Sequence, residues 1–244
     1  MAPRSQAYAR LVTQCPDPGL LDYFAAHRLF GVLPREALES IAAQTISRTY
    51  ARGHNVYTTG DPTTYVYVIR SGLVAMMELD ERSTERVLIT YSADDVSGSM
   101  CATLGMAHSC TATAILDSEI LHIPKRMFDS YYEQYPKLGL RVLQEVSQIV
   151  QRSRRTIMRL TLTPVPARVA SFLLDETDPK HSGAPGHSGI ELTLSHQDLA
   201  LLLGTTRESV TRVLDRLSRD GVIAVSRRSI EVLQPDRLRQ LINA

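Results

Sequence analysis

The chain has 244 residues, of which 43% are hydrophobic and 22% charged, a composition typical of a globular protein with one large or two smaller domains. We predict neither a membrane span nor a secretory signal, because no apolar run is long enough for either, and three cysteines favour a reducing, cytoplasmic setting over a disulfide scaffold. The net charge of +1 selects no partner, although arginines gather between Arg141 and Arg168, where Glu145 is the only acidic residue.

Three regions precede the arginine-rich segment. The first 20 or so residues contain three prolines, and we predict an arm with little fixed structure. Residues 20–48 show helical signals with a break at Gly31, after which Pro34 suits the first turn of a second helix. From about 49 to 123, short runs rich in Val, Tyr, Thr and Ile alternate with turns, and no helical period fits. This pattern predicts a small antiparallel sandwich or barrel.

A long helix is predicted from Pro136, because apolar residues return at alternating spacings of three and four. A narrow seam of this kind on a long helix commonly pairs with a copy of itself, so we predict a homodimer; packing on its own domain is the alternative. Ser153 is the polar break, and such positions can fix register or meet a ligand. The predicted dimer seam consists of Leu143, Val146, Val150, Ile157 and Leu160.

The seam ends before Thr163 and Pro164, which we expect to be the N-cap and first turn of a helix through about Asp175. Residues 178–189 are rich in Gly, Pro, His and Ser and predict a loop, and residues 190–194 predict a short strand. Ser195 then suits the N-cap of a helix over 196–202.

A helix-turn-helix is predicted next. Gly204 lets the chain turn, and Thr205 or Thr206 suits the N-cap of a second helix over 207–219. Gly221 ends that helix, and "VIAVS" and "SIEVL" read as a two-stranded wing with Arg227 and Arg228 in its turn.

The second helix has the side chains that reading DNA requires. Arginine can bond bidentately to guanine and glutamate can accept from cytosine, which suits Arg207, Glu208 and Arg212 near the helix start. Short hydroxyl side chains and the wing arginines suit phosphates. The predicted DNA-binding residues are Arg207, Glu208, Arg212, Thr205, Thr206, Ser209, Arg227 and Arg228. The alternative is a helix pair used only for packing.

These residues resemble the CRP/FNR superfamily of bacterial transcription regulators. The segment "TTRESVTRVLDRL" is similar to the family's recognition helix, and "RGHNVYTTGDPTTYVYVIRSGLV" looks like the first strands of its cyclic-nucleotide-binding fold. The resemblance implies an α+β fold: a cyclic-nucleotide-binding-like β-roll with flanking helices (1–135), a dimerisation helix (136–162) and a winged helix-turn-helix domain (163–244). It also implies a homodimer, effector-governed binding to a palindromic operator, and RNA polymerase as a partner.

The effector region departs from the family pattern. Cyclic-AMP binders of the family carry a glycine–glutamate pair and then an arginine–serine pair; here Gly98 is followed by Ser99, and Ser109 and Cys110 stand at the second pair. A buried phosphate without a bidentate cation is poorly compensated, so we expect no binding of cyclic AMP. These four residues, together with Ser153 on the long helix, form the predicted effector pocket.

Other effectors stay open. Four thiolates are needed for an FNR-like iron–sulfur cluster, and this chain has three cysteines. Cys101, His108 and Pro3 loosely echo the family's haem sensors, but with the wrong local spacing, and the simpler expectation for His108 is an exposed loop histidine. Cys101 and Cys110 could form a redox pair, although free buried cysteines are commoner. The last option is no effector at all, and the cofactor stays undetermined.

Two other classes of function were weighed. A cyclic-nucleotide-fold module that acts on a protein partner is the main competitor, and the arginine–glutamate–arginine face argues against it. No enzyme is predicted, because the chain has no phosphate-cradling loop, no HExxH and no nucleophile motif. We also predict no metal site, since the histidines are scattered. The sequence leaves open the target genes and whether they are activated or repressed.

Overall fold

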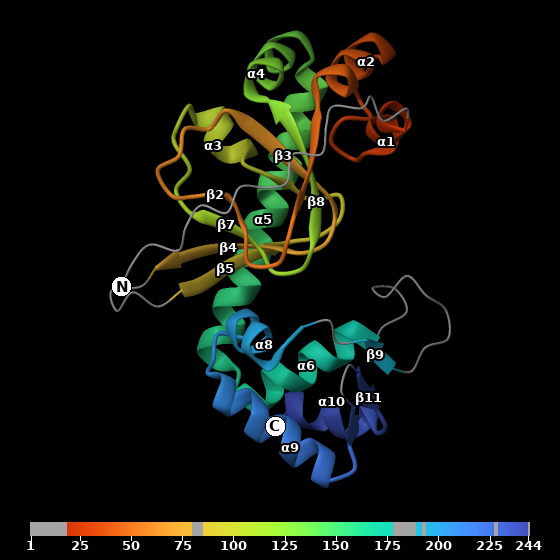
Figure 1. Ribbon diagram of the computed structural model, residues 1–244, viewed down its shortest axis with the longest axis vertical. Coiled ribbons are helices and arrows are strands. Elements are labelled where there is room, and N and C mark those ends of the chain that lie inside the picture. Colours follow the sequence, from red (N-terminus) through yellow and green to blue (C-terminus); the bar gives the residue numbers. More distant parts are fainter. Residues whose placement is uncertain (1–18, 80–84, 178–188, 192–193, 227–228, 244) are drawn as a thin grey trace. The chain divides into compact units, whose positions relative to one another are not determined.

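The computed structural model describes residues 19–79, 85–177, 189–191, 194–226 and 229–243 (Figure 1). The chain forms two compact units whose boundary lies between Ser153 and Arg154, inside the long helix α5 (Pro136–Leu162); residues 85–87 group with the second unit. The predicted N-terminal arm falls almost wholly outside the described residues. The predicted order of β-roll, long helix and C-terminal helix-turn-helix is confirmed.

The first unit is built on two four-stranded antiparallel sheets, with strand orders β1-β8-β3-β6 and β2-β7-β4-β5. Its strands are β1 (Ile46–Tyr50), β2 (Asn55–Tyr57), β3 (Tyr65–Ser71), β4 (Val74–Leu79), β5 (Glu85–Tyr91), β6 (Val96–Ser97), β7 (Thr111–Ala114) and β8 (Ser118–Pro124). Its helices, besides the first part of α5, are α1 (Leu20–Ala26), α2 (Arg35–Gln44), α3 (Ser99–Leu104) and α4 (Lys125–Gln134).

Two of these helices were not predicted. We expected only strands between 49 and 123, but α3 lies there, between Gly98 and Gly105, both of which have positive φ. A helix of six residues is too short to show a period in the sequence. The helix α4 begins directly after β8, so its pattern merged with the strand before it. The first strand also begins earlier than expected, at Ile46.

Alternation along the strands divides the core of this unit in two. On β3, Val66 and Val68 face the helices, whereas Tyr67 and Ile69 belong to a second cluster with residues of the other sheet. Side chains of period two point to opposite faces, so a single central strand supplies both clusters. The cluster between the sheets is unusually rich in tyrosine, with Tyr50, Tyr57, Tyr67 and Tyr91 all buried.

The second unit holds α6 (Val165–Thr177), β9 (Gly189–Glu191), α8 (His196–Leu202), α9 (Arg207–Arg219), β10 (Ile223–Val225), β11 (Ser229–Val232) and α10 (Pro235–Asn243), with sheet order β10-β11-β9. The predicted helices over 196–202 and 207–219 and the two-stranded wing are confirmed. Two helix starts were placed one residue early. In the first unit, α2 begins at Arg35 and Pro34 is its N-cap. In the second unit, α6 begins at Val165, and the carbonyl of Pro164 before it accepts from the amide of Arg168. No helix among the described residues could cross a membrane.

Candidate nucleic-acid interface

The first helix of the pair, α8, is fixed at its start by a reciprocal cap. The amide of Asp198 donates to the hydroxyl of Ser195 at 3.3 Å, and the amide of Ser195 donates to the Asp198 carboxylate at 2.7 Å. Two amides that the helix cannot satisfy are thereby bonded. The predicted N-cap at Ser195 is confirmed.

The turn between α8 and α9 requires a glycine. Gly204 has a φ of +59°, and a Cβ there would lie 2.5 Å from the Leu160 side chain. The turn is held by Arg168 of α6, whose guanidinium donates to the carbonyls of Leu203 at 2.6 Å and of Gly204 at 3.3 Å. Burial lowers the pKa of Arg168. Its sequence position gave no sign of this role, because it looks like one more arginine of the solvated helix faces.

The helix α9 begins at a second cap. Thr206, rather than Thr205, is the N-cap: its hydroxyl accepts from the amide of Ser209 at 3.2 Å and donates to the Ser209 hydroxyl at 3.1 Å. The helix buries Val210, Leu214 and Leu217 against the rest of the unit. Its orientation is therefore fixed at one end by a cap and along its length by an apolar face.

The opposite face of α9 is exposed and charged. Arg207, Glu208 and Arg212 are all exposed there. Hydrogen bonding from its own backbone amide is the largest cause that holds the pKa of Glu208 below its usual range, so the side chain is an ionised acceptor at neutral pH. Farther along, Arg216 pairs with Asp220 at 3.8 Å. The three predicted base-reading side chains are thus all open to solvent in the first half of α9.

The remaining predicted DNA contacts differ from one another. Ser209 and Thr205 are half-buried, and the donor of Thr206 is engaged by the cap. Arg227 and Arg228 lie outside the described residues. One hydrogen bond within the protein was also not predicted. Nδ1 of His196 on α8 is 3.0 Å from the hydroxyl of Thr211 on α9, so these side chains join the two helices.

The predicted effector residues are only partly brought together. Gly98 is the N-cap of α3 and has a φ of +79°, and a Cβ there would lie 3.1 Å from the Tyr67 ring. Ser99 and Cys110 are buried, whereas Ser109 is exposed and Ser153 on α5 is half-buried. Only part of the predicted set is therefore enclosed by the β-roll.

Side chains occupy the interior next to Cys110. The sulfur of Met76 accepts from the hydroxyl of Tyr57 at 3.1 Å and from the Cys110 thiol at 4.0 Å. The Tyr57 hydroxyl is also 2.7 Å from the hydroxyl of Ser97. Tyr57 and Cys110 therefore both donate to the Met76 sulfur, and the Tyr57 hydroxyl joins Ser97 to the same group.

The candidate sensing residues are buried. The expectation of an exposed His108 is wrong: it is 2% exposed, because its backbone pairs with Gly60 and Asp61 and its ring stacks on Tyr57 at 3.6 Å between centroids. Cys101 and Cys110 are free and buried, as expected for core cysteines. Burial raises the pKa of the Cys110 thiol, which opposes the thiolate that a reactive cysteine requires. The described residues contain no group of three or more His, Cys, Asp or Glu that could hold a metal ion.

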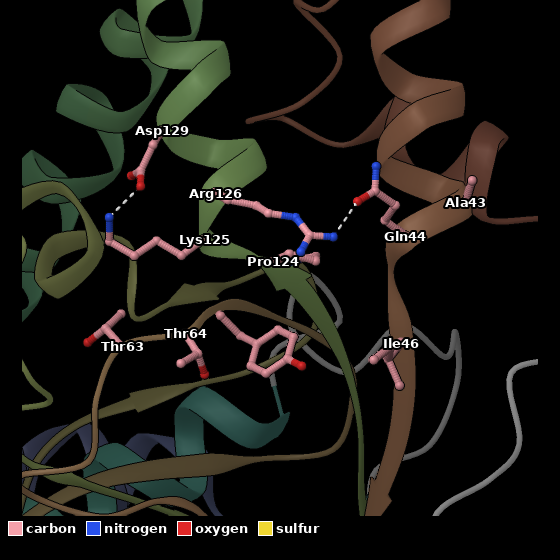
Figure 2. A pocket seen from close by; sticks show the side chains of 10 residues that line it. Ala43, Gln44, Ile46, Thr63, Thr64, Pro124, Lys125, Arg126 and Asp129 are labelled. Carbon is pink, nitrogen blue, oxygen red and sulfur yellow. Dashed lines mark hydrogen bonds and ion pairs between the residues drawn. The ribbon is translucent and has the colours of Figure 1, made fainter.

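A surface pocket of about 620 Å³ lies elsewhere on the first unit, where the end of α2, the start of β3 and the start of α4 meet. Figure 2 shows Lys125 reaching Asp129 and Arg126 reaching Gln44, so both cations of the pocket have partners within the unit. None of the predicted effector residues lines this pocket.

The predicted dimer seam is mostly exposed on α5. Leu143, Val150 and Ile157 are each about 60% exposed and Leu160 is 41% exposed. Val146 differs, because it is partly buried against the core of the first unit. The exposed apolar residues return every seven positions at 143, 150 and 157, so they form a stripe along one side of the helix.

Comparisons with known proteins match both units. Residues 47–135 match the family described as the cyclic nucleotide-binding domain, and residues 167–241 match the family described as the Crp-like helix-turn-helix domain. The global nitrogen regulator of Synechocystis sp. is 28% identical over 197 residues, which cover 80% of this chain and 88% of that protein. The regulatory protein HlyX of Actinobacillus pleuropneumoniae is 27% identical over 185 residues, covering 75% and 76%.

The fold is also similar to solved structures. FixK2 from Bradyrhizobium japonicum superposes with a TM-score of 0.70 at 21% identity and covers 82% of this chain and 98% of its own. At that identity the likeness concerns the fold alone, and it agrees with the arrangement of strands and helices described above.

Proposed function

Because the chain belongs to the CRP/FNR superfamily of transcription regulators, we propose that it acts as a homodimer that reads a palindromic operator through α9. The observation that carries this proposal is the exposed face of Arg207, Glu208 and Arg212 on a helix whose other face is buried. A recognition helix enters the major groove with its N-terminal residues at the base edges. Arg207 and Arg212 then bond guanines, and Glu208 accepts from a cytosine.

The dimer follows from α5. Leu143 and Val150 of the first unit are large apolar side chains about 60% exposed, and covering such a stripe with a second copy removes it from water. We assign residues 1–135 to a sensory domain, 136–162 to dimerisation and 163–244 to DNA binding. RNA polymerase is the further partner that a transcription regulator of this kind contacts in the bacterial cytoplasm, and the proposed role involves no catalysis.

We further propose that the β-roll does not bind cyclic AMP. Ser99 replaces the family's acid, and Ser109 and Cys110 replace its arginine and serine; Ser109 is exposed, and the thiol of Cys110 bonds Met76. A phosphate placed there would meet no guanidinium from these positions. The haem and thiol alternatives gain no support from His108, which is stacked under Tyr57, or from Cys110, whose pKa is raised.

Selection of bound DNA from a random duplex pool tests the proposed function. The full-length protein should enrich a two-fold-symmetric site with half-sites about one helical turn apart, roughly 10 bp from centre to centre. Sedimentation of the complex should give two protein chains per duplex. If no symmetric sequence is enriched, with or without added thiol or haem, the DNA-reading proposal is wrong and the protein-partner alternative takes its place.

A further inference from the structure

Four charged side chains meet where α5 packs on the β-roll. The guanidinium of Arg28 donates to the Asp95 carboxylate at 2.8 Å and to the Glu145 carboxylate at 2.9 Å. Arg152 donates to the second oxygen of Asp95 at 2.9 Å, and the amide of Ser92 donates to the same oxygen, also at 2.9 Å. We call Arg28, Asp95, Glu145 and Arg152 the Asp95 network.

The Asp95 network is buried and joins distant segments. The Asp95 and Glu145 side chains are each 7% exposed. Arg28 follows α1, Asp95 precedes β6, and the other two residues lie on α5. Buried ion pairs gain little net stability over apolar packing, but removing one partner leaves an uncompensated charge. The four groups are therefore satisfied together in one position of α5 on the β-roll.

That position matters because of what α5 carries. Arg152 is the last residue but one of the first unit, and the same helix bears the exposed stripe assigned to dimerisation and continues into the second unit. The Arg152 guanidinium also lies 5.6 Å from the centre of the Tyr91 ring, a buried member of the cluster between the sheets. The Asp95 network thus reaches from α5 to the β-roll interior, where Tyr57 and Cys110 both donate to Met76.

We propose that Asp95 is a positioning residue for DNA binding: it fixes α5 on the β-roll with the protein's own charges, so that the regulator binds its operator without a small-molecule effector. This inference rests on the proposed function. Arg28 and Arg152 both contact one buried carboxylate. These contacts hold α5 on the β-roll, as a ligand that bridges the β-roll and α5 would.

The experiment compares operator affinity before and after removal of bound small molecules. Full-length protein is unfolded in denaturant, desalted, refolded and titrated with the selected operator; the affinity should equal that of the untreated protein. Asp95→Asn should weaken operator binding by roughly tenfold or more, within the usual range of coupling between distant sites. Arg152→Gln is the milder variant, because Asp95 keeps Arg28, and Arg152→Lys should recover most of the affinity.

A matched control separates positioning from general stability. Glu119→Gln breaks the Arg70–Glu119 pair, at 3.1 Å in the same unit, which does not involve α5; operator affinity should be unchanged. Hydrogen exchange should speed up in the α5 amides of the Asp95 and Arg152 variants and not in the control, while all variants still sediment as dimers. Equal affinities of wild type, Asp95→Asn and Arg152→Gln would overturn the positioning role.

The outcomes distinguish this inference from the proposed function. Refolded wild type that binds only after addition of a small-molecule fraction from cells would contradict effector independence and leave the DNA-reading role intact. Wild type that binds no symmetric site in either state would contradict the proposed function itself.

Discussion

The two units of this chain differ in how far apart in the sequence their interacting residues lie. In the helix-turn-helix unit, the side chains proposed to read bases and the cap of their helix lie within seven consecutive residues, from Thr206 to Arg212. In the β-roll unit, the bonds that occupy the interior and fix α5 join residues 19 to 117 positions apart. A helix displays its function as a local pattern, whereas a sheet interior assembles it from segments that no local pattern connects.

This difference also separates what the chain keeps of its family from what it changes. In the helix-turn-helix, Arg207, Glu208 and Arg212 are exposed as the resemblance to the family predicts, and a cap fixes the start of each of the two helices. In the β-roll, Gly98 caps α3, and the thiol of Cys110 donates to Met76, which also accepts from Tyr57. Under the proposed function, the same fold would read DNA as its relatives do while its β-roll takes no cyclic AMP.

The largest expected effect is loss of the proposed homodimer. Val150→Asp places a charge in the exposed stripe of α5, and burying it against a second copy costs several kcal/mol. We expect a monomer by sedimentation and loss of binding to the palindromic operator. Leu79→Asp, at a residue 65% exposed on β4, is the control and should leave both unchanged. A Val150→Asp protein that remains a dimer removes the stripe from the account.

The next prediction concerns the β-roll alone. Burial, followed by the nearby Arg48, lowers the pKa of His122 from 6.5 to about 3. Below pH 6.5, His122 is protonated in the unfolded chain but stays neutral in the folded one. The free energy of unfolding therefore decreases as the pH is lowered, by about 1.4 kcal/mol per pH unit from this residue. Burial also lowers the pKa values of His27 and His108, so in chemical unfolding between pH 6.5 and 4.5 the slope should be shallower in His122→Gln than in the wild type by about this amount rather than absent. Equal slopes would mean that His122 does not titrate on unfolding.

A smaller effect sharpens the DNA-reading side of the comparison. Arg212→Ala should cost roughly 1–3 kcal/mol of operator binding and relax the preference at one base pair, because a bidentate guanine contact is lost. Arg216→Ala is the matched control on the same helix, where the guanidinium pairs with Asp220. The measurement is a titration of both variants against single-base operator variants at two salt concentrations. Uniform weakening by Arg212→Ala, with the base preference intact, would make Arg212 a phosphate contact.

The smallest effect lies in the local structure that supports the face. Thr206→Ala removes the hydroxyl that caps α9 and should lower the stability of the helix-turn-helix unit by about 1 kcal/mol. Thr205→Ala should cost less, because Thr205 closes the turn through its backbone amide, which donates to the carbonyl of Ala200. Thermal unfolding of the two variants compares their stabilities directly. Equal losses of stability would contradict the assignment of Thr206, rather than Thr205, as the N-cap.

The sequence was sufficient for features that are periodic or capped. Spacing within a few residues predicts the strands and the long helix. It also predicts Ser195 as a cap and the exposed side chains between Arg207 and Arg212. It was insufficient where distant segments meet. His108 was placed on the surface because nothing nearby in sequence reports its stacking on Tyr57, and the partners of Asp95 lie 57 and 67 residues away. Arg168 illustrates the same limit, since its partners in the turn lie 35 and 36 residues away.

The central claim is that the chain keeps DNA reading and has given up cyclic AMP, and one binding isotherm tests both parts. The selected operator is titrated with full-length protein in the absence and in the presence of millimolar cyclic AMP, with calorimetry of the nucleotide alone beside it. The account predicts tight, sequence-specific binding, superimposable curves and no heat from the nucleotide. Micromolar affinity for cyclic AMP, with operator binding that depends on it, would contradict the account.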